Sequence, residues 1–220
     1  MALRVQKGNM YGFVSHTWNT IKGKCEHDCS YCYMKKWNRL RERRFDMQEL
    51  KTDLGSGNFI FVGSSCDMFS DKVSPEWIKL TLEHCSKFAN KYLFQTKNPA
   101  NFLKYAELFP NGTILCTTLE SNRLYPEIMA NSPPPVIRAE SMALLNKFER
   151  HVTIEPILDF DKQEFVEMIK QISPIQVNIG ADSGGHHLPE PSKQNVLALI
   201  EELKTFTTVF EKKNLRRILK

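Results

Sequence analysis

Residues 24–33 read Lys-Cys-Glu-His-Asp-Cys-Ser-Tyr-Cys-Tyr and set Cys25, Cys29 and Cys32 at a C-x-x-x-C-x-x-C spacing. Thiolates are the usual protein ligands of iron–sulfur clusters. Three of them can bind three irons of a cubane cluster and leave the fourth iron without a protein ligand. An open metal position is typical of a catalytic site more than of a structural one. The spacing therefore predicts a catalytic [4Fe-4S] cluster held by these three cysteines.

Two simpler interpretations of the cysteines stay open. His27 could complete a Cys3His zinc site, although it lies inside the loop and not in a second, distant ligand pair. A disulfide framework requires an oxidising compartment, and residues 1–8 lack the apolar core of a signal peptide. No stretch approaches the roughly 20 apolar residues that cross a bilayer. We therefore expect a cytoplasmic protein without membrane contact, whose six cysteines are reduced thiols or metal ligands.

Length and charge give further expectations. The 220 residues suit a single domain, 1–220, and a hydrophobic content of 41% supplies its core. The net charge of +5 is unevenly placed, with a second basic run over residues 212–220 and a first run of Lys35, Lys36, Arg39, Arg41, Arg43 and Arg44. A basic run is either a solvated face or a surface that binds phosphates. Trp37 lies within the first run and Phe45 directly follows it, and they either stack on bases or pack on the core.

Short β-rich apolar runs alternate with helical patterns along the chain. The expected strands lie at 12–15, 58–63, 92–96, 113–118, 152–156 and 176–180, with a weaker seventh at 207–210. Helix starts are indicated by Ser74-Pro75, by Asn98-Pro99 and by a capping box of Asp161 with Glu164. This alternation predicts a mainly parallel sheet with right-handed crossovers. Six such units are too few for a closed eight-stranded barrel, so we expect an α/β fold, a partial (β/α)6 TIM-like barrel.

In parallel α/β folds, ligands bind at the carboxyl ends of the strands. Every expected strand ends in polar or small residues, at 63–67, 95–97, 117–120, 155–156 and 180–187. Glu155 is either a cofactor ligand or a buried structural acid. His186 and His187 are surface residues, acid–base groups or substrate contacts. Among the other cysteines, Cys85 and Cys116 are expected in the core.

The cysteine motif, with Tyr31 just before its last cysteine, resembles the signature of radical S-adenosylmethionine (SAM) enzymes. The resemblance implies the partial-barrel fold and a [4Fe-4S] cluster whose free iron is chelated by SAM. It implies an enzyme that cleaves SAM to methionine and a 5′-deoxyadenosyl radical, which takes a hydrogen atom from the substrate. An external donor such as flavodoxin or ferredoxin would supply the electron. The Gly-Gly-Glu motif of the superfamily is absent here; residues 63–67 read Gly-Ser-Ser-Cys-Asp in its place.

Within the superfamily, the chain is similar to spore photoproduct lyase, a DNA-repair family, in this segment and at Tyr33 and Lys97. The similarity implies that Lys97 binds the SAM carboxylate. The expected cofactor-binding residues are Tyr31, Ser64, Ser65, Asp67, Lys97, Glu120 and Asp182. Most of the chain also resembles a phage-associated three-cysteine radical SAM-like family, through the segments 16–19 (His-Thr-Trp-Asn) and 180–184. That second resemblance does not supply a reaction.

The predicted function is hydrogen abstraction from a macromolecule, DNA or RNA in the first place, in a modification or repair reaction. Tyr33 and Cys66 are the expected catalytic residues, since a thiol at position 66 could donate a hydrogen atom to a substrate radical, although it could also simply fill space. Three alternatives remain. The chain could modify a peptide or protein by radical SAM chemistry, use SAM for polar group transfer, or be a non-catalytic metal-binding module for nucleic acid.

Overall fold

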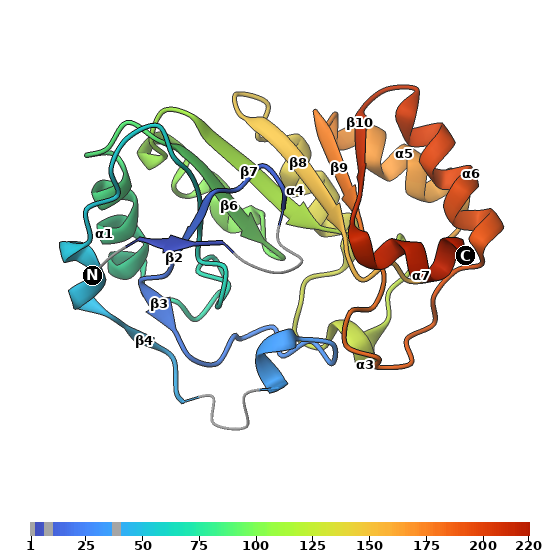
Figure 1. Ribbon diagram of the computed structural model, residues 1–220, viewed down its shortest axis with the longest axis horizontal. Coiled ribbons are helices and arrows are strands. Elements are labelled where there is room, and N and C mark those ends of the chain that lie inside the picture. The colour runs from blue at the N-terminus through green and yellow to red at the C-terminus, as the bar shows by residue number, and fades with distance from the viewer. Residues whose placement is uncertain (1–2, 7–10, 37–40) are drawn as a thin grey trace.

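A computed structural model of the chain describes residues 3–6, 11–36 and 41–220. Trp37 and Arg39, which belong to the first basic segment, lie outside the described residues. The helices and strands of the fold can be followed in Figure 1 from the blue N-terminal strands to the red C-terminal helix.

Eight strands form one sheet in the order β1-β2-β5-β6-β7-β8-β9-β10. Their bounds are Arg4–Val5 (β1), His16–Trp18 (β2), Phe59–Val62 (β5), Lys91–Thr96 (β6), Thr113–Thr118 (β7), Glu149–Ile154 (β8), Gln176–Ile179 (β9) and Thr208–Glu211 (β10). Strand β1 runs antiparallel to β2, and all other neighbours are parallel. Within the described residues β1 and β10 do not pair, so the sheet is an open partial barrel (Figure 1). The predicted α/β class and partial barrel are confirmed, and β10, the weak seventh strand, is a full member of the parallel sheet.

The prediction of a strand at 12–15 is wrong, because the first parallel strand begins at His16. Tyr11 and Val14 are buried instead against the inner face of the sheet, in a small cluster with Phe61, Leu93, Ile114 and Cys116. The apolar residues that indicated a strand therefore fill the interior of the open barrel. Burial of Cys116 in this cluster confirms the core position expected for it.

Helices cover the outer face of the sheet (Figure 1). Their bounds are Pro75–Cys85 (α1), Ala100–Leu103 (α2), Pro126–Met129 (α3), Pro135–Ala143 (α4), Lys162–Ile172 (α5), Lys193–Lys204 (α6) and Arg216–Leu219 (α7). Proline occupies the start of α1, α3 and α4, where its missing N–H has no intrahelical partner to lose. The capping box at α5 is wrong: Asp161 stands at the N-cap but makes no cap bond, since its carboxylate binds Arg123.

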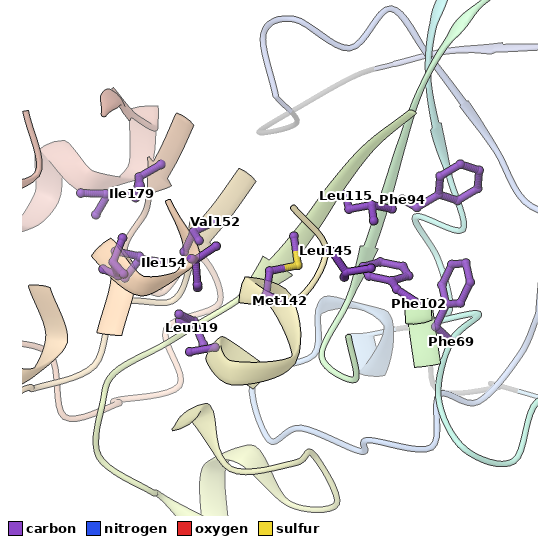
Figure 2. Close-up of a cluster of buried hydrophobic side chains, with 14 of the residues drawn as sticks. Phe69, Phe94, Phe102, Leu115, Leu119, Met142, Leu145, Val152, Ile154 and Ile179 are labelled. Atoms are coloured by element: carbon purple, nitrogen blue, oxygen red, sulfur yellow. The ribbon is translucent and has the colours of Figure 1, made fainter. Parts of the chain in front are cut away.

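The main core lies between these helices and the sheet. Figure 2 shows strand residues such as Phe94, Leu115 and Val152 packed against Met142 of α4 and Phe102 of α2. Cys85 is fully buried in the same core, as expected. Because the inner and outer residues alternate along each strand, the core fixes which side chains face the inside of the barrel.

The cysteine loop leaves and rejoins the fold through a two-stranded antiparallel ribbon of β3 (Ile21–Lys22) and β4 (Arg44–Phe45). Gly23 has φ +107°, and a Cβ there would lie 2.6 Å from the Glu42 carbonyl oxygen, so the ribbon requires glycine at this point. The 3-10 helices η1 (Tyr33–Lys36) and η2 (Met47–Lys51) follow the last cysteine and β4. Ion pairs join β3 to the start of η2: Lys22 Nζ lies 2.7 Å from Asp46 Oδ2 and 2.6 Å from Glu49 Oε1.

Candidate active site

A cavity of about 1080 Å³ lies where the cysteine loop meets the carboxyl ends of the parallel strands. Its lining includes all but two of the residues predicted for the site, namely Cys25, Cys29, Tyr31, Cys32, Tyr33, Ser64, Ser65, Asp67, Lys97 and Asp182. Among the described residues that line the cavity, Cys66 and Glu120 are absent. Segments that are far apart in sequence therefore meet at one place, as the position of strand ends predicted.

The three motif cysteines present free thiols to this cavity. Hydrogen bonding from Cys66 lowers the pKa of Cys25 to about 6, assisted by His27 and against the effects of burial and Asp67. Burial raises the pKa of Cys32. Three free thiols at one cavity are nonetheless a donor set that fits an iron–sulfur cluster, which cysteines bind as thiolates. In the described part of the chain, no three His, Cys, Asp or Glu side chains converge as they would around a single metal ion.

Cys29 is the most deeply placed of the three, with 5% of its surface exposed. Its Sγ lies 3.5 Å from Ser132 Oγ and 3.9 Å from the Met129 carbonyl oxygen. The backbone of the loop is joined to the same region, because the Ser30 amide donates to the Ile128 carbonyl at 2.9 Å. The segment from α3 to α4 thus supports the loop from outside the sheet, and Figure 1 shows α3 at the same end of the barrel as the blue loop.

Asp67 fastens the cysteine loop to the end of strand β6. Its Oδ2 accepts hydrogen bonds from His27 Nε2 at 2.9 Å, Thr96 Oγ1 at 2.9 Å and the Lys97 amide at 2.8 Å. Its Oδ1 accepts from the Phe69 amide at 2.9 Å. Burial alone would raise the pKa of Asp67, but His27 and the amide donors overcome burial and hold it below its usual range. Both carboxylate oxygens are therefore engaged within the protein.

Lys97 belongs to a buried polar network that also holds Tyr31. Its Nζ lies 2.5 Å from Tyr31 Oη and 2.6 Å from Glu120 Oε1, and the Tyr31 hydroxyl donates to the same carboxylate. Arg138 Nη1 binds the other oxygen of Glu120 at 2.7 Å, and both of these side chains are fully buried. Burial alone would raise the pKa of Glu120, but Lys97 and Arg138 lower it to about 2. The carboxylate thus stays ionised beneath the cavity, where it fixes Lys97 and Tyr31.

Arg138 was missed by the sequence reasoning. It lies on the face of α4 that also carries Ala139 and Met142, both fully buried. A cation on the apolar face of a helix requires a buried anion as partner. That pattern was the signal that could have found it, and with it the ion pair with Glu120.

Asn19 explains the geometry of the segment after β5. The Ser65 amide donates to Asn19 Oδ1 at 2.9 Å, and Asn19 Nδ2 lies 3.2 Å from Ser64 Oγ. The Tyr33 hydroxyl donates to the Ser64 carbonyl at 2.7 Å. Asn19, the last residue of the His-Thr-Trp-Asn segment, therefore orders the turn that replaces Gly-Gly-Glu, and Tyr33 closes over it from the cysteine loop.

Asp182 orders the loop after β9. Its carboxylate accepts from the Gly184 amide at 2.9 Å, the His186 amide at 2.5 Å and His186 Nδ1 at 2.6 Å. Asp182 and His186 both line the cavity. His187 has φ +55° and, among the described residues, is not part of the cavity lining.

The inner floor of the cavity holds polar residues that sequence reasoning did not assign. Tyr11 Oη donates to Gln95 Oε1 at 2.7 Å and lies 2.6 Å from Thr153 Oγ1. Lys212 Nζ lies 4.8 Å from the centre of the Tyr11 ring and 2.5 Å from Glu155 Oε2. Of the two interpretations of Glu155, the ion pair supports the structural acid. Tyr11 carried no motif, whereas Lys212 opens the second basic run.

In the structure, neighbouring acidic residues offset part of the positive charge of the first basic segment, the run of cations from Lys35 to Arg44. Acidic residues of the loop face its cations: Asp28 Oδ1 lies 2.7 Å from Lys35 Nζ, and Glu26 Oε2 lies 3.6 Å from Arg43 Nη2. Phe45 stacks on Trp77, with ring centres 5.7 Å apart, and packs against the core. Of its two expected roles, Phe45 therefore takes the structural one.

No protein-family model matches the sequence, and no curated protein matches it. Solved structures share its fold. A spore photoproduct lyase with bound AdoMet and dinucleoside spore photoproduct aligns with a TM-score of 0.67 at 10% identity, over 94% of this chain and 80% of that chain. A mutant of spore photoproduct lyase gives a TM-score of 0.69 at 10% identity, over 94% and 79% of the two chains.

Streptococcus suis SuiB bound to S-adenosylmethionine aligns with a TM-score of 0.60 at 12% identity, over 89% of this chain and 49% of SuiB. The class of protein that the fold defines is therefore the partial barrel of the radical SAM type. Within it, the chain has the fold of spore photoproduct lyase over nearly its whole length.

Proposed function

We propose that this chain is a radical SAM enzyme that modifies or repairs nucleic acid. One observation carries the proposal: three thiols of a C-x-x-x-C-x-x-C motif and a lysine at the end of β6 line a single cavity at the mouth of a partial barrel. In two of the aligned structures, AdoMet or S-adenosylmethionine is bound to a protein of this fold. The cluster and SAM, when bound, would supply a one-electron cleavage that leads to hydrogen abstraction from the substrate.

The residues have distinct roles in this proposal. Cys25, Cys29 and Cys32 bind the cluster. Lys97 pairs with the SAM carboxylate as a charge-assisted contact. Tyr31 and Glu120 hold the ammonium group of the Lys97 side chain in place. The predicted contacts of Ser64, Ser65, Asp67 and Asp182 with SAM are kept as part of the proposal. The Asp67 carboxylate already accepts a hydrogen bond from His27. A contact between Asp67 and SAM would therefore be additional to that bond.

Tyr33 is the better placed of the two predicted catalytic residues. Its side chain is 54% exposed and lines the cavity, and its hydroxyl is held by the Ser64 carbonyl. A phenol in this position can contact substrate and donate a hydrogen atom to it. Cys66, by contrast, is 3% exposed.

Nucleic acid is favoured as substrate by two observations. Spore photoproduct lyase, which shares the fold, binds a dinucleoside spore photoproduct in a solved structure. Exposed cations, Lys36, Arg41 and Arg44, lie along the loop that carries the cysteines. Positive charge beside a cavity attracts a phosphate backbone. The electron donor in this proposal is a flavodoxin or ferredoxin.

The test is anaerobic reconstitution with iron and sulfide, then addition of dithionite and SAM, with 5′-deoxyadenosine measured by mass spectrometry. We expect 5′-deoxyadenosine from the wild-type protein, more of it when DNA or RNA oligonucleotides are added, and none from Cys29→Ala. S-Adenosylhomocysteine in its place would indicate group transfer. Stimulation by peptides alone would indicate the protein-modifying alternative, and a colourless zinc protein that ignores SAM would overturn the proposal.

A further inference from the structure

Gln95 presents a side-chain amide to the inner floor of the cavity. It lies on β6, is half-buried and lines the cavity together with Tyr11 and Thr118. The Tyr11 hydroxyl donates to Gln95 Oε1 at 2.7 Å, and Gln95 Nε2 donates to Thr118 Oγ1 at 3.0 Å. Thr153 Oγ1, 2.6 Å from Tyr11 Oη, then donates to the phenol, whose only proton is already given to Gln95. The amide is therefore held at both ends by residues of the barrel interior.

These two hydrogen bonds leave part of the amide free. A side-chain amide has two N–H donors and a carbonyl oxygen with two lone pairs. The bonds to Tyr11 and Thr118 use one donor and one lone pair, and within the residues that the structure describes Gln95 makes no other hydrogen bond. One donor and one acceptor thus remain side by side, in a fixed orientation, on the wall of the cavity. They form a preformed site for a ligand that carries an acceptor next to a donor.

An acceptor next to a donor is the pattern on the edge of a nucleobase. Glutamine binds adenine in this way, and enzymes that act on a base hold it by hydrogen bonds to its edge and by aromatic or apolar side chains against its face. Phe61, on the neighbouring strand β5, supplies such a surface, because it lines the cavity and pairs in register with Leu93, two residues before Gln95. Gln95 lies two residues, roughly 7 Å, before Lys97 along the chain. With the SAM carboxylate at Lys97, the inner floor is left for the substrate.

We propose that Gln95 is a substrate-binding residue: its amide hydrogen-bonds the edge of one nucleobase that is turned out of the nucleic-acid strand into the barrel. This inference rests on the proposed function and names the part of the nucleic acid that the cavity recognises. Exposed cations at the rim bind phosphates of any sequence, whereas the amide contacts a base. The two contributions can be separated, because an abasic strand keeps the phosphates and lacks the bases.

The experiment measures, by fluorescence anisotropy, the binding of single-stranded DNA to the anaerobically reconstituted protein with SAM. One oligonucleotide is fully abasic, and the other has the same backbone with a single base, either adenine, guanine, cytosine or thymine. Gln95→Ala removes the amide, Gln95→Leu keeps most of its volume, and Gln95→Glu replaces the donor by a second acceptor. Gln163→Ala, at an exposed position of α5, is the control. Affinity for the abasic strand reports whether each variant is folded.

We expect the wild-type protein and Gln163→Ala to bind a base-bearing strand about tenfold more tightly than the abasic strand. Gln95→Ala and Gln95→Leu should lose this difference and bind the abasic strand as the wild type does. Gln95→Glu should prefer guanine over the other bases, because guanine presents two adjacent N–H donors on one edge.

Equal affinity of the wild-type protein for base-bearing and abasic strands would overturn the inference, as would an undiminished difference in Gln95→Ala. A raised Kd for SAM in Gln95→Ala, with the base preference kept, would assign the amide to the adenine of SAM. Formation of 5′-deoxyadenosine that peptides stimulate in the wild type but not in Gln95→Ala would assign it to a peptide backbone. Either result would also overturn the inference. Absence of binding to every strand by the wild-type protein would instead contradict the nucleic-acid substrate of the proposed function.

Discussion

At the scale of single residues, the buried carboxylates Asp67 and Glu120 divide the work of holding the site. Asp67 anchors the cysteine loop through His27, while Glu120 holds Lys97 and Tyr31. Both were predicted as contacts of SAM because they follow strands at the correct end of the sheet. Their surroundings show that a carboxylate at a strand end can equally position the residues that face the ligand. Sequence gives the residue type and its end of the strand but not the direction of the side chain.

Lys97→Met tests the predicted contact with the SAM carboxylate. Loss of a charge-assisted hydrogen bond costs roughly 1.5–3 kcal/mol, so the Kd for SAM should rise about tenfold or more. Isothermal titration calorimetry on the anaerobically reconstituted protein measures this. Lys104→Met, at an exposed position directly after α2, is the control and should bind SAM as the wild type does. Equal affinities for both variants would show that Lys97 does not bind SAM.

Glu120→Gln should destabilise the fold and change its response to acid. Removing the anion leaves the Arg138 and Lys97 cations uncompensated, at a cost of about 3–5 kcal/mol at neutral pH. The pKa of Glu120 is lowered to about 2 from 4.5 in the unfolded chain. Its stabilising effect is therefore complete above pH 4.5 and is lost as the pH falls towards about 2.

Urea unfolding at several pH values measures this effect. The difference in unfolding free energy between wild type and Glu120→Gln should shrink as the pH falls below 4.5. Glu140→Gln, at an exposed position of the same helix α4, should unfold like the wild type at each pH. A constant difference between wild type and Glu120→Gln would contradict the ion-pair explanation.

At the scale of elements, a polar residue at the N-cap position of a helix does not always make the capping hydrogen bond. Ser192 accepts a hydrogen bond from the Asn195 amide at 3.2 Å and caps α6. Asp161 stands at the same position of α5 but binds Arg123, with Asp161 Oδ1 2.6 Å from Arg123 Nη2. The capping box was predicted from residue types alone, and a distant arginine competed successfully for the carboxylate.

Ser192→Ala should therefore destabilise the protein by about 1 kcal/mol, the usual cost of an N-cap. Asp161→Ala should cost less, because it removes only an exposed ion pair. Urea titration at neutral pH compares the two variants directly. A larger loss in Asp161→Ala than in Ser192→Ala would reverse this assignment of the caps.

The elements also show where prediction from sequence reached its limit. Six of the seven expected strands lie within three residues of the observed ones, and all of them but β10 carry apolar runs that are buried in the parallel sheet. Segment 12–15 failed because its apolar residues are buried without sheet pairing. The cysteines and Lys97 were found because motif spacing and strand ends are local features. Tyr11 reaches the site through tertiary packing, which no local pattern records, and only the position of Arg138 on an apolar helix face gave a signal for its buried ion pair.

At the scale of the whole molecule, charge and openness decide which partner the cavity can accept. Acids within the loop, such as Glu26 and Asp28, offset part of the positive charge counted in the first basic segment. Steering of nucleic acid then depends on the exposed cations at the rim of the cavity more than on the net charge of +5. No helix within the described residues is long and apolar enough to cross a membrane.

Lys36→Glu should weaken binding of single-stranded DNA or RNA, since Lys36 is exposed and lines the cavity. The loss should be similar for all base sequences and should lower the salt slope of the affinity by about one. Fluorescence anisotropy over a range of salt concentrations measures both quantities. Lys87→Glu is the matched control, because Lys87 is exposed near the amino ends of β5 and β6. Equal losses in the two variants would argue against a binding surface at the cavity.

The ribbon of β3 and β4 has a consequence for the cysteine loop when no metal is bound to it. The chain enters and leaves the cysteine loop through two paired strands, so the ends of the loop stay together even when its interior loosens. The entropic cost of closing the loop has thus already been met by the ribbon before any iron arrives. If the proposed cluster is bound, we expect its loss to be a local event that leaves the sheet and its helices folded and keeps the three thiols close enough to one another to take up a new cluster.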